Sequence, residues 1–294
     1  MSFILKLVEP KPSTKVKLMD KEIIIIYCIC DDYLKVIHHW EDPQCRMSDA
    51  EVMTTALVAV LYFGGNFALA QRFLSRPDYI QTMLSKSRFS RRLHRIKHHF
   101  LAVFGLLAEM WKTINIEHIY SLDTFPVAVC DNYRIPRAKI YQAEAFRGYV
   151  ASKKRYFYGL KIHLMITEAG QPVEFFLTPG SYYDGSCLPW FDFDIPAGST
   201  IFADKSYNLY WMEDLLKEAG IELLPMRKKN SKRALSPWMT YLQHVYRKAV
   251  ETAGSLINQR LPSHIHAVTA ACFELKVTLF VLALSFSHVF KVAT

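Results

Sequence analysis

The stretch Glu117–Cys130, with the sequence EHIYSLDTFPVAVC, decides how the rest of the chain is interpreted. Its apolar residues predict a central β-strand, and Asp123 lies inside that strand. An ionised carboxylate at a half-buried strand position costs several kcal/mol unless it is paired, hydrogen-bonded or bound to a metal. Asp123 therefore needs a partner, either hydrogen bonding near Thr124 at a strand end or a functional group elsewhere in the chain.

Composition favours a globular protein with a polyanionic partner. The chain has 294 residues, 51% of them hydrophobic, so it can bury a sizeable core. Its 36 basic and 27 acidic residues give a formal net charge of +9, which favours nucleic acid or an anionic membrane surface. The uncharged part of the most apolar segment, from Val277 to Phe290, is too short to span a bilayer. We therefore expect nucleic acid and no membrane.

Targeting and cysteine patterns favour the cytoplasm. The N-terminal sequence MSFILKLVEPKP has neither the basic start nor the long apolar core of a signal peptide. The six cysteines show no C-x-x-C spacing and no repeating framework, which indicates reduced thiols. Histidine pairs such as His38/His39 lack a matching set of ligands, so no structural zinc site is predicted.

The N-terminal third is predicted to be helical. SDAE at Ser48–Glu51 is a capping box, followed by an apolar helix that ends at Gly64-Gly65. Helices over residues 67–74 and 80–84 lead to a long helix from Ser87 or Ser90 towards Lys112. This order is typical of a helix-turn-helix DNA-binding module, and a bundle with a solvated basic face is the alternative. The cations of this helix expected to bind DNA are Arg88, Arg91, Arg92 and Arg95.

Residues 131–155 are predicted to form a basic loop over the end of the first strand. Cations follow phosphates and aromatic rings stack on unpaired bases, so their mixture here suits nucleic acid. A disordered basic loop is the alternative. The cations expected to bind DNA are Arg134, Arg137, Arg147, Lys153, Lys154 and Arg155.

The rest of the chain predicts a mixed sheet flanked by helices, an α/β fold. FYGLKIHLMITEAGQPVEFFLTPG is a hairpin whose Lys161 and His163 share one face, either solvated or beside Asp123. STIFADKSY is a strand ending at Asp204. A helix over residues 208–219 and the strand IELLPM follow. A basic cluster comes next, which is expected to bind DNA phosphates: Arg227, Lys228 and Lys229.

Asp204 directly follows an apolar strand, where open α/β sheets place their ligands. If Asp123 and Asp204 converge, their charges repel, and a hard divalent cation such as Mg²⁺ neutralises them. A third carboxylate would complete a two-metal site, with ions about 3.5–4 Å apart. The candidate is Glu251, although periodicity alone favours an exposed pair with Arg247 at i, i+4.

The runs SLDTFPVAV, RIP, FYGLKIHL, FADKSY and YRKAVETAGSLINQRL resemble, in order and spacing, the catalytic domain of IS982-family transposases. The resemblance implies a ribonuclease H-like catalytic domain over residues 116–294, preceded by a helical DNA-binding region over residues 1–115. Asp123, Asp204 and Glu251 match the family's DDE triad, which implies two Mg²⁺ ions that Mn²⁺ can replace. The residues expected to steady phosphates are Lys161, His163, Lys205 and Arg247.

The resemblance also implies a function. The protein would be a cytoplasmic, nucleoid-associated bacterial transposase that frees a 3′-OH at each transposon end and joins it to target DNA. Its partners would be the double-stranded terminal repeats and target DNA, with a homo-oligomer assembled on them. The chain has ADKSY where the family usually has GDKGY, and Asn258 where a basic residue is common. An inactive DNA-binding protein of transposase descent and a metal-dependent nuclease without strand transfer are the alternatives.

Overall fold

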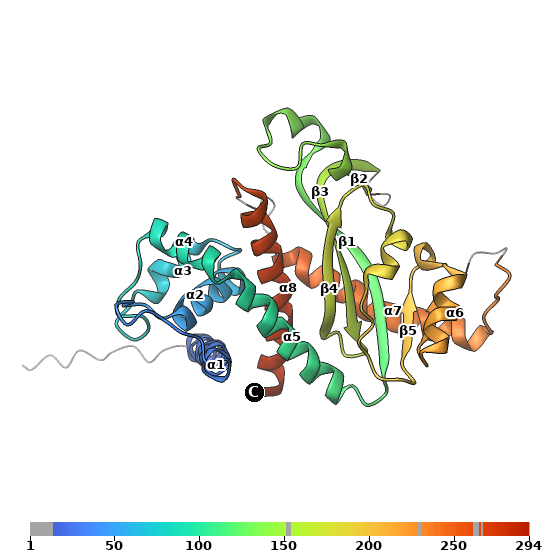
Figure 1. The fold of residues 1–294 in the computed structure, drawn as a ribbon, viewed down its shortest axis with the longest axis horizontal. Helices are drawn as coiled ribbons and strands as arrows, with labels where there is room; N and C mark the ends of the chain where they lie inside the picture. The colour runs from blue at the N-terminus through green and yellow to red at the C-terminus, as the bar shows by residue number, and fades with distance from the viewer. Residues whose placement is uncertain (1–13, 151–153, 228–230, 261–264, 266, 294) are drawn as a thin grey trace, which may run out of the picture.

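The computed structural model describes residues 14–150, 154–227, 231–260, 265 and 267–293. A mixed β-sheet flanked by helices adjoins a group of N-terminal helices (Figure 1). The helices are α1 (Thr14–Val36), α2 (Asp49–Tyr62), α3 (Phe67–Leu74), α4 (Lys86–Arg95), α5 (Lys97–Ile114), α6 (Tyr210–Glu218), α7 (Pro237–Arg260) and α8 (Ala270–Ala293). The strands are β1 (Ile119–Asp131), β2 (Arg147–Val150), β3 (Arg155–Thr167), β4 (Pro172–Pro179), β5 (Thr200–Ala203) and β6 (Glu222–Pro225). The 3-10 turns are η1 (Asn132–Arg137), η2 (Glu144–Phe146), η4 (Asp184–Trp190) and η5 (Lys205–Tyr207).

β1 is the central strand, as the sequence predicts. It pairs antiparallel with β3 on one side and parallel with β5 on the other, and β6 continues the sheet in parallel. The outer edge of the long strand β3 pairs with β2 and then with β4, both antiparallel. This mixed sheet with flanking helices, preceded by N-terminal helices, confirms the predicted fold class.

Local signals at α2 and α3 are confirmed. The Ser48 hydroxyl accepts from the N–H of Glu51, and the Glu51 carboxylate accepts from the N–H of Ser48, which completes the capping box. The helix ends before Gly64 and Gly65, both of which have positive φ. The helix predicted over residues 67–74 is α3, whereas residues 80–84 are not helical.

The long helix predicted from Ser87 or Ser90 towards Lys112 is two helices. α4 begins after Ser85, and Ile96 ends α4 where α5 begins. Ile96 is buried, as are Leu93 and Phe100, so the apolar stripe continues across the bend. Because the stripe is uninterrupted and no Gly or Pro lies there, nothing in the periodicity marks the bend.

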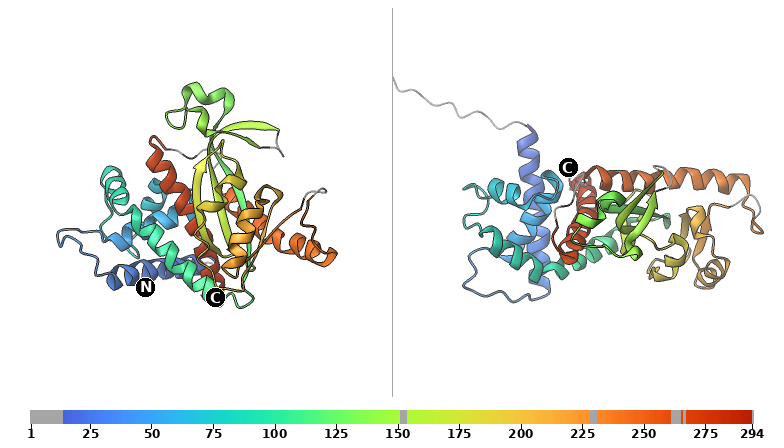
Figure 2. Two further views of the ribbon diagram at one scale, coloured as in Figure 1. Left: turned by 45° about the vertical axis from the view of Figure 1, so that its right-hand side comes forward. Right: turned by 90° about the horizontal axis from the view of Figure 1, so that it is seen from above.

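α8 lies between the N-terminal helices and the sheet (Figure 2). It packs against α2, α5 and α7, and Trp111 Nε1 donates to Ser285 Oγ at 2.7 Å. By length and composition α8 could cross a membrane, but 72% of its most apolar window is buried inside the protein, as in a core helix. A single hydrophobic core therefore includes residues from both predicted parts of the chain, and the division at residue 115 stays a prediction.

Candidate functional site

Asp123 and Asp204 lie at matching positions on one face of the sheet. Leu122 of β1 is paired with Ala203 of β5, so the next residues along the two parallel chains are Asp123 and Asp204. Matched side chains on neighbouring parallel strands point to the same side, and such strands are about 4.8 Å apart. The sheet therefore brings two of the three predicted carboxylates together.

Helix α7 is held against this face of β1 by two contacts. Ser121 Oγ donates to the carbonyl oxygen of Tyr246 at 3.1 Å. Gly254 lies on the ring of Phe125, so closely that an added Cβ would be 1.9 Å from the ring. Ser121 and Phe125 flank Asp123 on its own side of the strand, because strand side chains alternate.

These contacts bring Glu251 level with Asp123. The four residue steps from Ser121 to Phe125 rise about 13 Å along the strand, and the eight steps from Tyr246 to Gly254 rise about 12 Å along the helix, so α7 runs alongside β1. The point on α7 beside Asp123 is Val250, which is fully buried, and Glu251 is the next residue. The third predicted carboxylate is thus near the other two and 55% exposed.

Arg247 links two of the carboxylates. Its Nη1 donates to Asp204 Oδ1 at 2.7 Å, and its Nε lies 3.0 Å from Glu251 Oε1. The i, i+4 pair of Arg247 with Glu251 that was considered from the sequence is therefore present, and Arg247 is also paired with Asp204. One guanidinium balances both carboxylates in this structure.

Burial is the main reason why the pKa of Asp123 is raised to about 6. The N–H of Thr124, which donates to Asp123 Oδ1 at 2.8 Å, and the charge of Arg247 lower this pKa, while Asp204 and Asp184 raise it. The hydrogen bond from Thr124 is the strand-end partner considered from the sequence, and it does not offset burial. A carboxyl group in this position gains from a nearby cation.

The donor chemistry fits a hard divalent cation, because all the ligands offered are carboxylate oxygens. Asp123 and Asp204 are adjacent, and the pKa of Asp123 is raised, mainly by burial and further by the charge of Asp204. Glu251 is paired with Arg247 instead. In the described residues no three His, Cys, Asp or Glu side chains are grouped closely enough to hold one ion. The role of Glu251 as a third ligand beside the aspartates stays a prediction.

Lys161 and His163 share one face of β3, as predicted, but it is the face opposite Asp123. His163 is paired with Thr124, whose side chain points away from that of its neighbour. His163 is fully buried and both ring nitrogens have partners, so the prediction that it steadies phosphates is wrong. Lys161 Nζ lies 2.8 Å from Asp184 Oδ1 and is occupied by that pair.

Acid should destabilise the protein through His163. Burial and the charge of Lys161 lower its pKa from 6.5 to about 3. Above pH 6.5 its contribution to stability is fully present; below it, the unfolded chain binds a proton that the folded chain does not, at a cost of up to about 1.4 kcal/mol per pH unit. Urea unfolding at a series of pH values between about 4 and 6 gives the slope of the unfolding free energy against pH. In His163→Gln this slope should be smaller than in the wild type by nearly the amount that one proton contributes. The same slope in both proteins would contradict this prediction.

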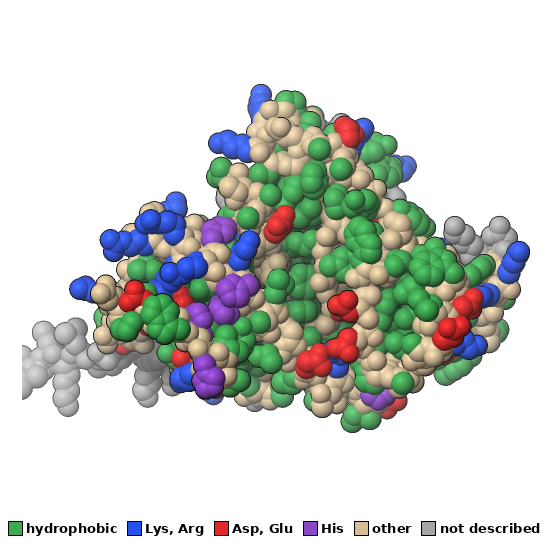
Figure 3. Space-filling model, viewed as in Figure 1, with side chains coloured by type: hydrophobic (Ala, Val, Ile, Leu, Met, Phe, Trp, Pro, Cys, Tyr) green, Lys and Arg blue, Asp and Glu red, His purple; other side chains and the backbone are tan. Residues whose placement is uncertain are grey.

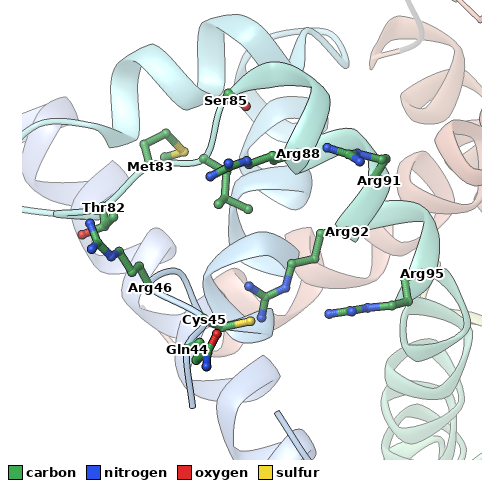
Figure 4. A pocket seen from close by; sticks show the side chains of 11 residues that line it. Gln44, Cys45, Arg46, Thr82, Met83, Ser85, Arg88, Arg91, Arg92 and Arg95 are labelled. Atoms are coloured by element: carbon green, nitrogen blue, oxygen red, sulfur yellow. The ribbon is translucent and has the colours of Figure 1, made fainter. Parts of the chain in front are cut away.

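Several predicted DNA-binding cations surround a cavity of about 790 Å³ beside α4 (Figure 4). Arg46, Arg88, Arg91 and Arg95 line it and are exposed, and no ion pair joins any of them to another described residue. Ser85, the residue before α4, makes no side-chain cap hydrogen bond, which leaves the first N–H groups of the helix available. Lys and Arg side chains gather over this part of the surface (Figure 3). The arrangement favours phosphate binding.

Two other predicted cations are built into the fold. Arg92 is 8% exposed, and it donates to Asp49 Oδ1 and to the carbonyl oxygen of Met47, both at 2.6 Å. Arg227 donates twice to Glu213, at 2.6 and 2.9 Å. These arginines balance buried carboxylates, so the prediction that they contact DNA is wrong in this structure. Lys153, Lys228 and Lys229 lie outside the described residues.

The segment predicted as a basic loop is a projecting arm made of η1, η2, β2 and the start of β3 (Figure 1). Tyr149 and Tyr156 are cross-strand partners with ring centroids 4.8 Å apart, and the Arg147 guanidinium lies 4.4 Å from the Tyr156 centroid. Arg155 is paired with Asp131 at 3.3 Å. The arm thus keeps the predicted mixture of cations and rings at the surface. The other predicted cations that are exposed are Arg134, Arg137 and Lys154 on the arm and Lys205 beside Asp204.

Three residues near the carboxylates were not predicted: Gly254, Tyr207 and Asp184. Gly254 was detectable, because a glycine inside a helix costs about 1 kcal/mol relative to alanine and so often marks close packing. Tyr207 hydrogen-bonds Thr124, and Asp184 raises the pKa of Asp123. No local pattern predicts either contact, because both depend on the fold of residues 180–207.

Comparison with known proteins identifies the family. A family model described as "Transposase DDE domain" matches residues 113–263, just over half of the chain, and this range includes Asp123, Asp204 and Glu251. No curated protein sequence matches. Among solved structures, the crystal structure of a pre-cleavage Mos1 transpososome is similar at 12% identity and a TM-score of 0.23, over 76% of this chain and 80% of that one. The chain belongs to the transposase DDE domain family.

Proposed function

We propose that the protein is the transposase of a bacterial insertion sequence related to the IS982 family. It acts on double-stranded DNA, cutting the phosphodiester at each transposon end to free a 3′-OH and joining that hydroxyl to target DNA. The observation that carries this proposal is the placement of Asp123 and Asp204 side by side under α7, in a chain of the DDE domain family.

Asp123, Asp204 and Glu251 would hold two Mg²⁺ ions, or Mn²⁺ in their place. When bound, the ions activate the attacking oxygen and stabilise the leaving oxygen. Arg247 would release Glu251 and bind a phosphate oxygen of the cut strand, because a guanidinium pairs as well with phosphate as with carboxylate. Lys205, exposed directly after Asp204, would bind a second phosphate oxygen.

Residues 1–115 would bind the transposon ends and residues 116–294 would carry out catalysis. The exposed arginines around the α4 cavity support this division, because they lie in the N-terminal part of the chain. We also propose that the protein is nucleoid-associated in the cytoplasm and forms a homo-oligomer when assembled on DNA.

The full-length protein can be incubated with a plasmid carrying its gene and the natural flanking DNA, and new 3′-OH ends mapped by sequencing. We expect breaks at the two ends of the element with Mg²⁺ or Mn²⁺ and none with excess chelator. Breaks that persist after exhaustive chelation would contradict the metal assignment. Binding without breaks would favour an inactive descendant, in which the Arg247–Glu251 pair stays closed.

A titration of DNA binding at several salt concentrations is expected to distinguish the α4 arginines from other surface cations. Arg88→Ala and Arg91→Ala should weaken binding to end DNA by about 1–3 kcal/mol and relax sequence preference if they reach base edges. If they contact phosphates, they should weaken end and scrambled DNA alike and lower the slope of log affinity against log salt by about 0.9 each. Arg72→Ala, an exposed arginine of α3 outside the cavity, is the matched control. Wild-type binding by Arg88→Ala and Arg91→Ala would exclude the cavity as a DNA site.

A further inference from the structure

A chain of buried hydroxyl and imidazole groups lies behind the carboxylates. Thr124 Oγ1 is hydrogen-bonded both to His163 Nδ1, at 3.0 Å, and to the hydroxyl of Tyr207. His163 Nε2 is 3.0 Å from Thr178 Oγ1. His163, Thr178 and Tyr207 have no exposed surface. The chain thus joins β1, β3, β4 and η5 on the side of the sheet opposite α7.

Burial keeps His163 neutral, because it lowers the pKa to about 3, so only one ring nitrogen carries a proton. One ring nitrogen therefore donates and the other accepts, so the Thr124 and Thr178 hydroxyls have opposite roles toward the ring. In either tautomer the ring holds Thr124 Oγ1 in place, and the Tyr207 hydroxyl is bonded to the same oxygen.

Two bonded members of this chain, Thr124 and Tyr207, are next to predicted metal ligands. Thr124 follows Asp123, and its N–H donates to Asp123 Oδ1 at 2.8 Å. Tyr207 ends the 3-10 turn that begins after Asp204, and its N–H donates to the carbonyl oxygen of Asp204 at 3.1 Å. The bond between the two hydroxyls therefore connects the backbone segments that carry the two aspartates.

This connection lies where the strand ladder stops. The parallel pairing of β1 with β5 ends at Leu122 and Ala203, one residue before the two aspartates. Beyond that point, repulsion between the carboxylates would push the segments apart when no cation is bound. The Thr124–Tyr207 bond opposes this separation, and His163 fixes the orientation of the Thr124 hydroxyl.

We propose that Thr124, His163 and Tyr207 are positioning residues that set the separation of Asp123 and Asp204 for divalent-cation binding. The inference rests on the proposed function, in which these aspartates hold metal. The alternative is a polar cluster that supports only the core of the sheet. The two differ in whether losing one hydroxyl changes metal affinity or only stability.

Thr124→Val and Tyr207→Phe each remove one hydroxyl with little change in shape. In Mn²⁺ titrations of the full chain by calorimetry, each should weaken binding about tenfold, as is usual when a group supporting a metal ligand is lost. Thr124→Ser, which keeps the hydroxyl, should bind like the wild type. Thr167→Val is the matched control, because it makes the same substitution at a buried threonine whose hydroxyl is bonded to Gln171 at the far end of β3. Melting temperatures without metal are measured for every variant.

The possible results distinguish failure of this inference from failure of the proposed function. Wild-type Mn²⁺ affinity in Thr124→Val and Tyr207→Phe, with lowered melting temperatures, would overturn the inference and leave the proposed function intact. Equal weakening by Thr167→Val would also overturn it, since the effect would then be general. If the wild type itself takes up no Mn²⁺, the metal-dependent function fails and the inference fails with it. Weakened binding in the first two variants with recovery in Thr124→Ser supports the inference.

Discussion

Asp123→Asn, Asp204→Asn and Glu251→Gln are each expected to lower the rate of DNA cleavage at least about 10³-fold, because each removes one negative ligand from a site whose ions supply several kcal/mol of transition-state stabilisation. Affinity for end DNA should change little, because the cations proposed to bind the transposon ends lie around the α4 cavity, and each substitution leaves Arg247 and Lys205 in place. Single-turnover cleavage and a binding titration measure the two quantities separately.

The control for these substitutions is Asp192→Asn, which makes the same chemical change at an exposed position in the loop before β5. It should cleave like the wild type. Full cleavage by Glu251→Gln would show that the third ligand lies elsewhere. Equal loss of cleavage and DNA binding in all three variants would indicate damage to the fold.

Gly254→Ala is expected to lower the free energy of unfolding by about 3 kcal/mol or more. A Cβ at this position would be 1.9 Å from the ring of Phe125, and overpacking of this kind costs about 1–3 kcal/mol even when the neighbours can shift. Relief requires α7 to move away from β1, which would also displace Glu251. Urea unfolding measures the first effect, and single-turnover cleavage under folding conditions measures the second.

Gly105→Ala is the matched control, because Gly105 is also inside a helix but an added Cβ would meet nothing within 4 Å. That substitution should raise stability by about 0.5–1 kcal/mol, the ordinary helix preference of alanine over glycine. If Gly254→Ala behaved in the same way, the close packing of α7 on β1 would be wrong.

The parts of the fold that depend on short-range patterns were predictable. The capping box at Ser48 and Glu51 needs only residues three apart, and Asp123 was detectable because a carboxylate inside an apolar strand demands a partner. Asp204 was detectable from its place at the end of a strand. Their side-by-side arrangement followed once both strands were assigned to one sheet.

The errors come from information that sequence spacing does not contain. Lys161 and His163 were correctly expected to share a face, but whether that face is the one with Asp123 depends on the register of β3 against β1. A shift of one residue would exchange the two faces. Arg92 lies three residues after Phe89 and next to Leu93, on the buried stripe, and its carboxylate partner Asp49 is far away in sequence. Glu251 was identified by resemblance, because its contact with Arg247 explains it equally well as a surface pair.

The most direct test of the central claim, that Asp123, Asp204 and Glu251 form the site of a transposase, is recovery of joined DNA in vitro. Full-length wild-type protein and Asp123→Asn are incubated with end DNA, a target plasmid and Mg²⁺, and junctions are sequenced. We predict junctions linking the 3′ end of the element to target DNA with the wild type and none with Asp123→Asn. Junctions formed equally by Asp123→Asn, or breaks without any junctions from the wild type, would contradict the claim.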